Sequence, residues 1–401
     1  MERIELTENQ RCVLTLLQKM GPLSKGDLAE RGAMGWATAV KVISQLSEQG
    51  MVDRLGTVRG DPRKKGKRAY LYGLSHDLPL AIGVDVEYRT TSMVLTNLHG
   101  DILAHATTAT IAPSSDTEVW RFLAETIGSF LRDHCEGRAV HGVGIGVPMI
   151  GFLSHSQVDN LRSMRDLEIT LSAQLALPVS VRDNTKSYAL FEQWRNSSFE
   201  SDDFIFVSIR TGIGTGVFYH GELYLGGTGL PGEIGHIQTV DSGGLPCRCG
   251  KQGCMETVVG QRNLYRAYCQ EVLHDEALAQ QSEQAGQEVL SEALFDLFRR
   301  ARAGETGSRE IVCRAADHLG RSLASAILVL DISNIIISGH FGDDGVLIED
   351  LLRTNLSAKL LRGSSFSVRY VPFDHLGHVR GAALLVLKDF LIDIRSNHEH
   401  G

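Results

Sequence analysis

The chain has 401 residues, of which 43% are hydrophobic, and its formal net charge is −8 at pH 7. This length is too great for one ordinary hydrophobic core, and the composition predicts a folded protein of two or three domains. The first residues alternate charged and apolar side chains, which a signal peptide does not, and no apolar run approaches the roughly 18 to 20 residues that a membrane span needs. We therefore expect a soluble, cytoplasmic protein with no membrane insertion.

The charges are distributed unevenly along the chain. Residues 1–75 contain 13 Lys and Arg against 8 Asp and Glu, a net charge of +5, which leaves a net charge of −13 for the remainder. A polyanion would bind most favourably to the basic part. The charge pattern therefore predicts a small basic N-terminal domain attached to a larger acidic one.

Three short helices are predicted in the N-terminal segment. Thr7 and Gln10 have the spacing of a capping box at the start of the first helix, and Ser24 can cap the second. A third helix follows the turn at 32–35 and runs to Gln49. Its apolar side chains recur at the spacing of one helix face, and they are Ala39, Val42, Ile43 and Leu46.

The opposite face of the third helix and a basic hairpin after it are candidate DNA contacts. The helix offers Trp36, Thr38, Lys41 and Gln45. Residues 51–72 alternate enough to form a hairpin, whose tip RGDPRKKGKR carries Lys64, Lys65, Lys67 and Arg68. A recognition helix for the major groove and a basic wing for phosphates would make residues 1–75 a winged helix-turn-helix domain that binds double-stranded DNA. The alternative is a solvated charged loop beside a small helical bundle.

From residue 80 to residue 392 the sequence alternates apolar strands with helices. Strands are expected at 80–110, 140–153 and 204–226, and helices at 116–133 and 261–330. Two halves of this part each open with a strand, a Gly-rich turn and a further strand. The spacing alone predicts an α/β fold. Residues 393–401 are expected to form a short polar tail.

One short segment concentrates potential metal ligands. Residues 232–256 read GEIGHIQTVDSGGLPCRCGKQGCME and contain His236, Cys247, Cys249 and Cys254. Thiolates and imidazole suit Zn²⁺, which takes four such ligands in a closed tetrahedron when its role is structural, and this argues against a hydrolytic metal. Ordinary reduced cysteines in a loop are the alternative. The odd total of seven cysteines argues against a disulfide framework.

The spacing E-x-x-H followed by C-x-C-G-x-x-G-C-x-E resembles that of the ROK family, which contains bacterial sugar kinases and sugar-responsive repressors. The resemblance covers nearly the whole chain, and it implies a two-lobed ribonuclease H-like (actin-like ATPase) sugar-kinase fold after the winged helix-turn-helix. It also implies that His236 and the three cysteines hold Zn²⁺, and that sugar hydroxyls are bound by Glu233, His236 and Glu256. Carboxylates accept pairs of hydrogen bonds from vicinal hydroxyls, which agrees with this role.

The catalytic base of the family's kinases is the Asp of an Asn-Asp pair, and this chain has the reverse order, Asp183 followed by Asn184. An amide cannot take a proton at neutral pH, so Asn184 cannot act as that base. Asp183 is displaced by one residue at a helix start, which rotates its side chain by about 100°. We expect both residues to form hydrogen bonds with sugar hydroxyls instead. Asn160, in the DNL before Arg162, matches an Asn-Leu of the family, and the resemblance implies that it is a further sugar contact; the alternative is a turn residue.

The nucleotide loops of the family are also altered in this chain. Where active members have a D-x-G-x-T turn, Glu87 stands in place of the glycine. The second loop, residues 211–216, is kept better, but the later adenosine loop contains His340 and Phe341, which would crowd a purine. These changes predict a sugar pocket that survives without catalysis.

Together these features predict a DNA-binding transcriptional repressor whose catalytically inactive ROK domain, residues 80–392, binds a sugar or sugar phosphate and holds structural Zn²⁺. Homodimers or homotetramers would place two recognition helices on a pseudo-palindromic operator. Two alternatives stay open. One is an ATP-dependent sugar kinase with an appended DNA-binding domain, and the other is a regulator for which zinc itself is the signal.

Overall fold

The computed structural model describes residues 6–57, 69–76, 80–87, 89–110, 116–135, 138, 140–148, 157–195, 203–227 and 231–391. The chain divides into two compact units, unit 1 with residues 1–197 and 376–401, and unit 2 with residues 198–375. The predicted domain boundary at residues 75–80 lies within unit 1 and stays a prediction, and the predicted tail at 393–401 lies outside the described residues. Within the described ranges, no helix is both long and apolar enough to cross a membrane.

Unit 1 begins with the three predicted helices, and their start signals act as expected. The side chains of Thr7 and Ser24 accept hydrogen bonds from the backbone amides of Gln10 and Asp27, whose own side chains accept a hydrogen bond from the cap residue in return. Both are therefore capping boxes. The helices are α1 (Glu8–Met20), α2 (Lys25–Arg31) and α3 (Trp36–Glu48).

A small antiparallel sheet completes this helical part, with strand order β1-β3-β2. The strands are β1 (Leu23–Ser24), β2 (Val52–Thr57) and β3 (Tyr70–Leu74). The two longer strands, β2 and β3, are the arms of the predicted hairpin. Its tip falls in residues 58–68, which lie outside the described residues together with the predicted contacts Lys64, Lys65, Lys67 and Arg68.

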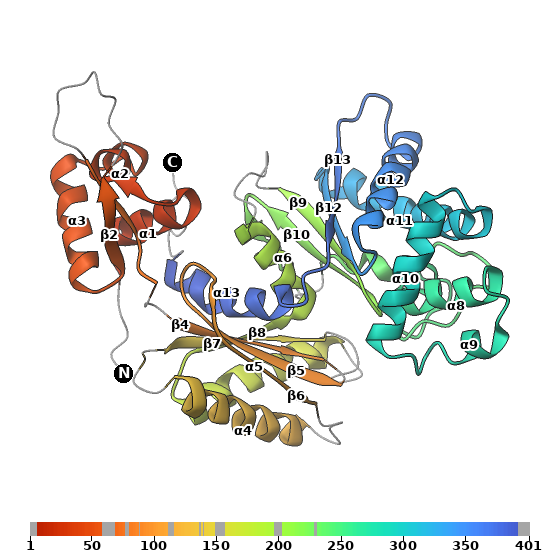
Figure 1. The fold of residues 1–401 in the computed structure, drawn as a ribbon, viewed down its shortest axis with the longest axis horizontal. Coiled ribbons are helices and arrows are strands. Elements are labelled where there is room, and N and C mark those ends of the chain that lie inside the picture. Colours follow the sequence, from red (N-terminus) through yellow and green to blue (C-terminus); the bar gives the residue numbers. More distant parts are fainter. Residues whose placement is uncertain are drawn as a thin grey trace. The chain divides into compact units, whose positions relative to one another are not determined.

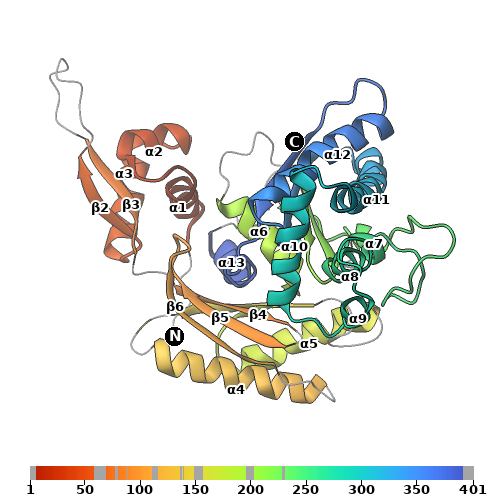
Figure 2. The same cartoon turned by 45° about the vertical axis from the view of Figure 1, so that its right-hand side comes forward.

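The first large sheet also belongs to unit 1 and has strand order β6-β5-β4-β7-β8. Strands β4, β7 and β8 are parallel, whereas β5 and β6 are antiparallel additions at one edge. Helices α4 and α5 cover one face, and α13 lies on the other face beside α6 (Figures 1 and 2). The elements are β4 (Leu80–Val86), β5 (Thr90–Thr96), β6 (Ile102–Ala109), α4 (Asp116–His134), β7 (Val140–Val147), α5 (Gln157–Leu175), β8 (Val179–Asp183), α6 (Asn184–Arg195) and α13 (Gly377–Leu391).

The sheet of unit 2 repeats this arrangement, which confirms the predicted duplication. Its strand order is β11-β10-β9-β12-β13, with β9, β12 and β13 parallel and β10 and β11 antiparallel at one edge. The strands are β9 (Phe204–Ile209), β10 (Ile213–Tyr219), β11 (Glu222–Leu223), β12 (Asn334–Gly339) and β13 (Ser367–Pro372). The helices are α7 (Glu256–Val259), α8 (Gln261–Glu271), α9 (Glu276–Gln280), α10 (Gln287–Arg302), α11 (Thr306–Leu330) and α12 (Val346–Lys359).

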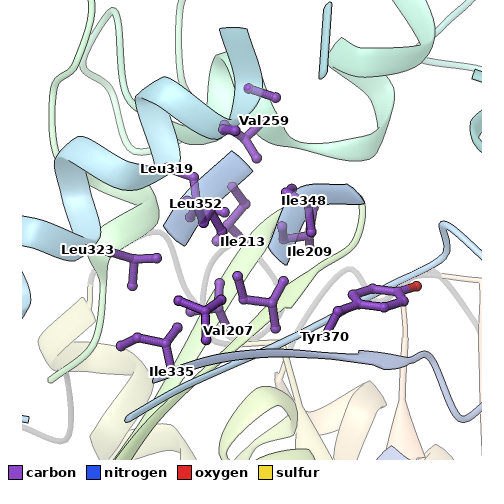
Figure 3. Close-up of a cluster of buried hydrophobic side chains, with 14 of the residues drawn as sticks. Val207, Ile209, Ile213, Val259, Leu319, Leu323, Ile335, Ile348, Leu352 and Tyr370 are labelled. Atoms are coloured by element: carbon purple, nitrogen blue, oxygen red, sulfur yellow. The ribbon is translucent and has the colours of Figure 1, made fainter. Parts of the chain in front are cut away.

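Buried hydrophobic side chains, most of them aliphatic, form the core of unit 2 (Figure 3). Leu319 and Leu323 of α11 lie in one buried cluster with Val207 of β9, Ile335 of β12 and Leu352 of α12. Each of these side chains is at most 1% exposed. Full burial of such a side chain contributes roughly 1.5 to 3 kcal/mol to stability, so this cluster holds the helices on the sheet of unit 2.

Helix α13 approaches the first sheet so closely that glycine is required beneath it. A Cβ atom at Gly83 would lie 1.9 Å from the carbonyl oxygen of Val379, and one at Gly144 would lie 1.8 Å from that of Ala382. Neither neighbour is a flexible side-chain end, so the backbone itself would have to move. The glycines of β4 and β7 therefore set the distance between the sheet and α13.

We predict that Gly144→Ala destabilises unit 1 by at least about 2 kcal/mol, because the added methyl group overpacks this contact. The matched control is Gly128→Ala on α4, where the nearest atom to the new Cβ is the Arg132 guanidinium at 3.5 Å. There the substitution stabilises the helix by about 0.5 to 1 kcal/mol. All three tryptophans, Trp36, Trp120 and Trp194, lie in unit 1, so urea unfolding followed by tryptophan fluorescence reports on it. Equal unfolding midpoints for the two variants would contradict the prediction.

Candidate functional site

The metal loop, residues 231–256, leaves the edge of the second sheet and folds back on itself. A short 3₁₀ turn spans Ile234–His236, and single β-bridges join Gln238 to Cys254 and Pro246 to Gln252. Gly253 has a φ of +74°, and a Cβ there would lie 2.2 Å from the carbonyl oxygen of Val240. Gly253 is therefore required at this crossing, because a residue with a Cβ atom suits neither this φ nor the space available.

The loop brings the four predicted ligands together. One potential ligand atom each from His236, Cys247, Cys249 and Cys254 lies within 4.8 Å of all the others. His236 Nδ1 is 3.4 Å from Cys247 Sγ, and Cys249 Sγ is 3.6 Å from Cys254 Sγ. Metal bonds of about 2.3 Å to sulfur and 2.0 Å to nitrogen in a tetrahedron require ligand separations close to these. The cluster therefore fits a metal ion with three sulfur ligands and one nitrogen ligand.

The electrostatics of the cluster also fit a cation. Burial raises the pKa of the Cys247 thiol to about 12 and raises that of Cys254, because a thiolate is poorly solvated there. Burial likewise lowers the pKa of His236, so its imidazole is neutral at pH 7. The pKa of the Cys249 thiol is instead lowered, because hydrogen bonds from the Lys251 amide and the neighbouring thiols outweigh its partial burial. Cys247 and Cys254 would hold their protons on their own, and a divalent cation stabilises the thiolate form that binds metals.

The second nitrogen of His236 faces a predicted sugar contact. His236 Nε2 lies 3.8 Å from Glu233 Oε2, while Nδ1 faces the thiols. A metal on Nδ1 leaves the ring proton on Nε2, where it can be donated to a carboxylate or a hydroxyl. The histidine therefore joins the metal cluster to the side where Glu233 lies.

Glu256, the other predicted carboxylate, supports the glycine-rich loop between β9 and β10. Its Oε2 accepts a hydrogen bond of 2.8 Å from the amide of Ile213. A Cβ at Gly212 would lie 2.8 Å from the same oxygen, so this carboxylate packs directly on the loop backbone. Thus Glu233, His236 and Glu256 all belong to unit 2 and are connected to the metal loop.

Asp183 and Asn184 lie in unit 1, where the parallel strands of the first sheet end. Asp183 Oδ1 accepts hydrogen bonds from the amides of Thr185 at 3.0 Å and Lys186 at 3.2 Å, so the carboxylate caps α6. The carbonyl oxygen of Asn184 accepts a hydrogen bond of 3.1 Å from Nδ1 of His378. The predicted contact Asn160 lies on α5, and its side chain is outside what the structure describes.

The carboxyl ends of β9, β12 and β13 carry the predicted adenosine loop of unit 2. His340 follows β12, is only 3% exposed, and lies 3.9 Å from the ring of Phe373, which follows β13. Phe341 instead turns into the core and stacks on Phe298 at 4.2 Å. The ring of Phe341 is therefore part of the core and is not exposed at the end of the sheet, and the crowding of a purine stays a prediction that rests on His340.

Sequence reasoning missed Phe373 as a residue of this edge. The Arg210 guanidinium, which follows β9, lies 5.2 Å from the centre of the Phe373 ring. Arg210, His340 and Phe373 each come directly after one of three parallel strands. The signal was available in the sequence, because residues that follow neighbouring parallel strands meet at one edge of the sheet.

The outer face of α3 presents the predicted helix contacts. Trp36 is 61% exposed, Lys41 and Gln45 are also exposed, and Thr38 is half-buried. The predicted apolar face is fully turned inward, with Ala39, Val42, Ile43 and Leu46 at most 5% exposed. The structure thus places all four predicted residues of α3 away from the domain's own core.

We predict that Glu256→Ala loosens the loop after β9, whereas Glu256→Gln does not, because the glutamine oxygen can still accept the hydrogen bond from the Ile213 amide. Loss of the acceptor leaves that amide without its partner at a cost of about 1 to 3 kcal/mol. Hydrogen exchange measured at Ile213 should be at least about tenfold faster in Glu256→Ala, since 1.4 kcal/mol corresponds to a factor of ten. Exchange that is equally fast in both variants would show that the carboxylate does not support this loop.

Comparisons with known proteins agree with this fold. A family model for the ROK family matches residues 81–389. The DNA-binding transcriptional dual regulator NagC of Escherichia coli K12 is 26% identical over 400 residues, covering 97% of this chain and 95% of NagC. A glucokinase of Halalkalibacterium halodurans is 29% identical over 272 residues, covering 66% of this chain and 81% of that enzyme.

A solved structure shows the same fold over almost the whole chain. The crystal structure of a ROK family transcriptional regulator, a homolog of the E. coli MLC protein, superposes with a TM-score of 0.74 at 21% identity and covers 96% of both chains. The family model itself spans well over half of this sequence. The chain therefore belongs to the ROK family.

Proposed function

We propose that this chain is a DNA-binding transcriptional repressor whose ROK domain binds a sugar or a sugar phosphate without phosphorylating it. The observation that carries this proposal is the share of the chain that each relative matches. The regulator NagC matches 97% of the chain, whereas the glucokinase matches 66%. The chain also has α3, whose outer face exposes Trp36, Lys41 and Gln45, ahead of the region that the family model matches.

The DNA side of the proposal rests on α3 and the hairpin that follows it. A major groove accepts one helix, and side chains such as Lys41 and Gln45 are long enough to reach phosphates and base edges from its surface. The basic residues at the hairpin tip, Lys64, Lys65, Lys67 and Arg68, would bind phosphates, and their contribution would fall as salt rises. A homodimer or homotetramer would present two such helices to a pseudo-palindromic operator.

The sugar side of the proposal rests on Glu233, His236 and Glu256 in unit 2. Carboxylate oxygens accept hydrogen bonds from hydroxyls, and the Nε2 proton of His236 can be donated to one, so the three side chains suit a polyhydroxylated ligand. The family resemblance adds Asp183, Asn184 and Asn160 from unit 1 as further hydroxyl contacts. A charged sugar phosphate or a neutral sugar satisfies the same contacts.

The residues at the start of α6 support the proposed absence of phosphoryl transfer. Asn184 cannot take a proton, and the Oδ1 atom of Asp183 already accepts two backbone amides. Glu87 places a negative charge in the first phosphate loop, and His340 stands at the edge where the family's kinases hold a nucleotide. A hydroxyl bound here would lack a correctly placed general base.

Zinc is the metal that the cluster fits best. Three thiolates and one imidazole in a closed tetrahedron are a structural zinc site, with no open position for water or substrate. Zn²⁺ would be held by Nδ1 of His236 and by Cys247, Cys249 and Cys254, and it would supply folding free energy to the loop. Its further effect is on the tautomer of His236, which would be fixed as a donor at Nε2.

We predict that Cys249→Ser removes the bound zinc and destabilises unit 2 by at least about 3 kcal/mol, the size expected when a ligand present in hundredfold or greater excess over its Kd is lost. The matched control is Cys313→Ser on α11, a free cysteine away from the cluster, which should keep one zinc per chain. Elemental analysis and thermal unfolding measure both effects. Retained zinc or an unchanged midpoint in Cys249→Ser would contradict a structural role.

The proposal as a whole is tested by fluorescence anisotropy on DNA from upstream of the gene and its neighbours, titrated with hexoses, amino sugars and their 6-phosphates. We expect tight, sequence-specific binding that one of these compounds releases. Lys41→Ala should weaken binding to all sequences, and Gln45→Ala should cost about 1 to 3 kcal/mol at one base position. Arg309→Ala, which removes an exposed charge in unit 2, is the control and should bind as the wild type does.

Phosphorylation of a hexose with ATP at the rate of a typical kinase would contradict the proposal and support the alternative of a sugar kinase with an appended DNA-binding domain. The 29% identity to a glucokinase is the observation that keeps this alternative open. The assay needs only the full chain, ATP and the same sugar panel. We expect no turnover above the buffer control.

A further inference from the structure

The end of the N-terminal helical part is held by the turn between β5 and β6, residues 97–101. Asn97 Nδ2 donates a hydrogen bond of 3.0 Å to the carbonyl oxygen of His76, and His99 Nε2 lies 2.9 Å from that of Leu74. The rings of His76 and His99 stack with their centres 4.3 Å apart. His76 Nδ1 also lies 3.3 Å from Asp101 Oδ2. Four contacts therefore join the residues just after β3 to a turn of the first sheet.

Asn97 is the centre of this turn. It is 1% exposed, and its Oδ1 accepts hydrogen bonds of 3.0 Å from the amides of both His99 and Asp101. Its Nδ2 also donates to Asp101 Oδ2 at 3.0 Å, and this hydrogen bond is the main reason that the pKa of Asp101 lies below its ordinary value. The His76–Asp101 pair is largely exposed and contributes little by comparison. The buried amide of Asn97 therefore holds both the turn and its contact with His76.

The same turn is tied to α13 from the other side. Arg380 Nη2 donates a hydrogen bond of 2.8 Å to the carbonyl oxygen of Gly100, whose φ of +78° suits glycine. The Arg380 guanidinium also lies 4.8 Å from the ring centre of Phe191 on α6. Two residues before Arg380 on α13, His378 Nδ1 donates a hydrogen bond to the carbonyl oxygen of Asn184, and its ring centre lies 4.3 Å from that of Tyr188. Helix α13 thus connects the turn to the first residue of α6.

We propose that the turn at 97–101 is an interdomain latch. It would couple the start of α6, at Asp183 and Asn184, to the position of the DNA-binding domain. This inference rests on the proposed function, because it assigns the route by which a bound sugar would change DNA affinity. A ligand that shifts the backbone of Asn184 also shifts His378 and α13, since close-packed elements move as bodies. The shift reaches Gly100 through Arg380 and then reaches residues 74–76 through Asn97 and His99.

Two variants remove contacts between the turn and residues 74–76 while keeping neighbouring interactions. Asn97→Asp keeps the oxygen that accepts the two turn amides but loses the Nδ2 donor to His76, and it places a second carboxylate against Asp101. His99→Phe keeps a ring beside His76 but loses the Nε2 contact with Leu74. Ser92→Ala on the same hairpin is the control, because its partner is Thr107 Oγ1 at 3.1 Å and not the latch.

The first readout is the ratio of operator Kd with and without the sugar that releases DNA, measured on the full chain. We expect both latch variants to bind that sugar within about twofold of the wild type, while the ratio falls at least fivefold towards one. Ser92→Ala should keep the wild-type ratio. A wild-type ratio in both latch variants would overturn the inference.

The second readout does not depend on sugar or DNA. Small-angle X-ray scattering of the free protein should give a larger radius of gyration and a longer maximum dimension for Asn97→Asp than for Ser92→Ala. If the wild type bound neither operator nor sugar, the proposed function would fail, and scattering alone would still decide whether the latch exists. Identical scattering of the two variants would show that the turn does not hold the DNA-binding domain. Altered scattering with an unchanged Kd ratio would show that the turn does not couple sugar binding to DNA binding.

Discussion

The shared use of His236 is the constraint on which the functional part of the structure depends. Its Nδ1 lies 3.4 Å from Cys247 Sγ, and its Nε2 lies 3.8 Å from Glu233 Oε2. The same ring therefore serves the metal cluster and the side where a sugar would bind. A loop of this length without regular strands has too few apolar side chains to hold itself, so bonds to a metal would supply the rigidity that a core supplies elsewhere.

The two sheets explain why the remaining polar residues gather as they do. Each has three parallel strands, so residues at the carboxyl ends of those strands lie at one edge of the sheet. They are Asp183 and Asn184 in unit 1, and Arg210, His340 and Phe373 in unit 2. A sugar kinase with this fold would need a base at the first edge and room for a purine at the second. In this chain, the edge in unit 1 has the amide of Asn184 and the carboxylate of Asp183, which caps α6. The edge in unit 2 is filled by the rings of His340 and Phe373. Under the proposed function, these residues bind a ligand and do not transfer a phosphoryl group.

Local signals in the sequence were sufficient for much of this account. The Thr7 and Ser24 caps, the apolar face of α3 and the spacing of the four metal ligands each depend on residues close together in the chain, and the structure bears them out. The direction of Phe341 and the contact between Asn97 and His76 could not be predicted in this way. Both depend on which distant element lies alongside, and a pattern within one segment carries no information about that.

Under the proposed function, sugar binding and DNA binding are linked within one chain, and no chemical reaction takes place. The most direct measurement is isothermal titration of the releasing sugar into the free protein and into the protein saturated with operator DNA. Because linkage is reciprocal, a sugar that releases DNA must bind the DNA complex more weakly, and we predict a Kd at least about fivefold higher there. Equal affinities in the two titrations, or heat from continuing turnover when ATP is added, would contradict the account.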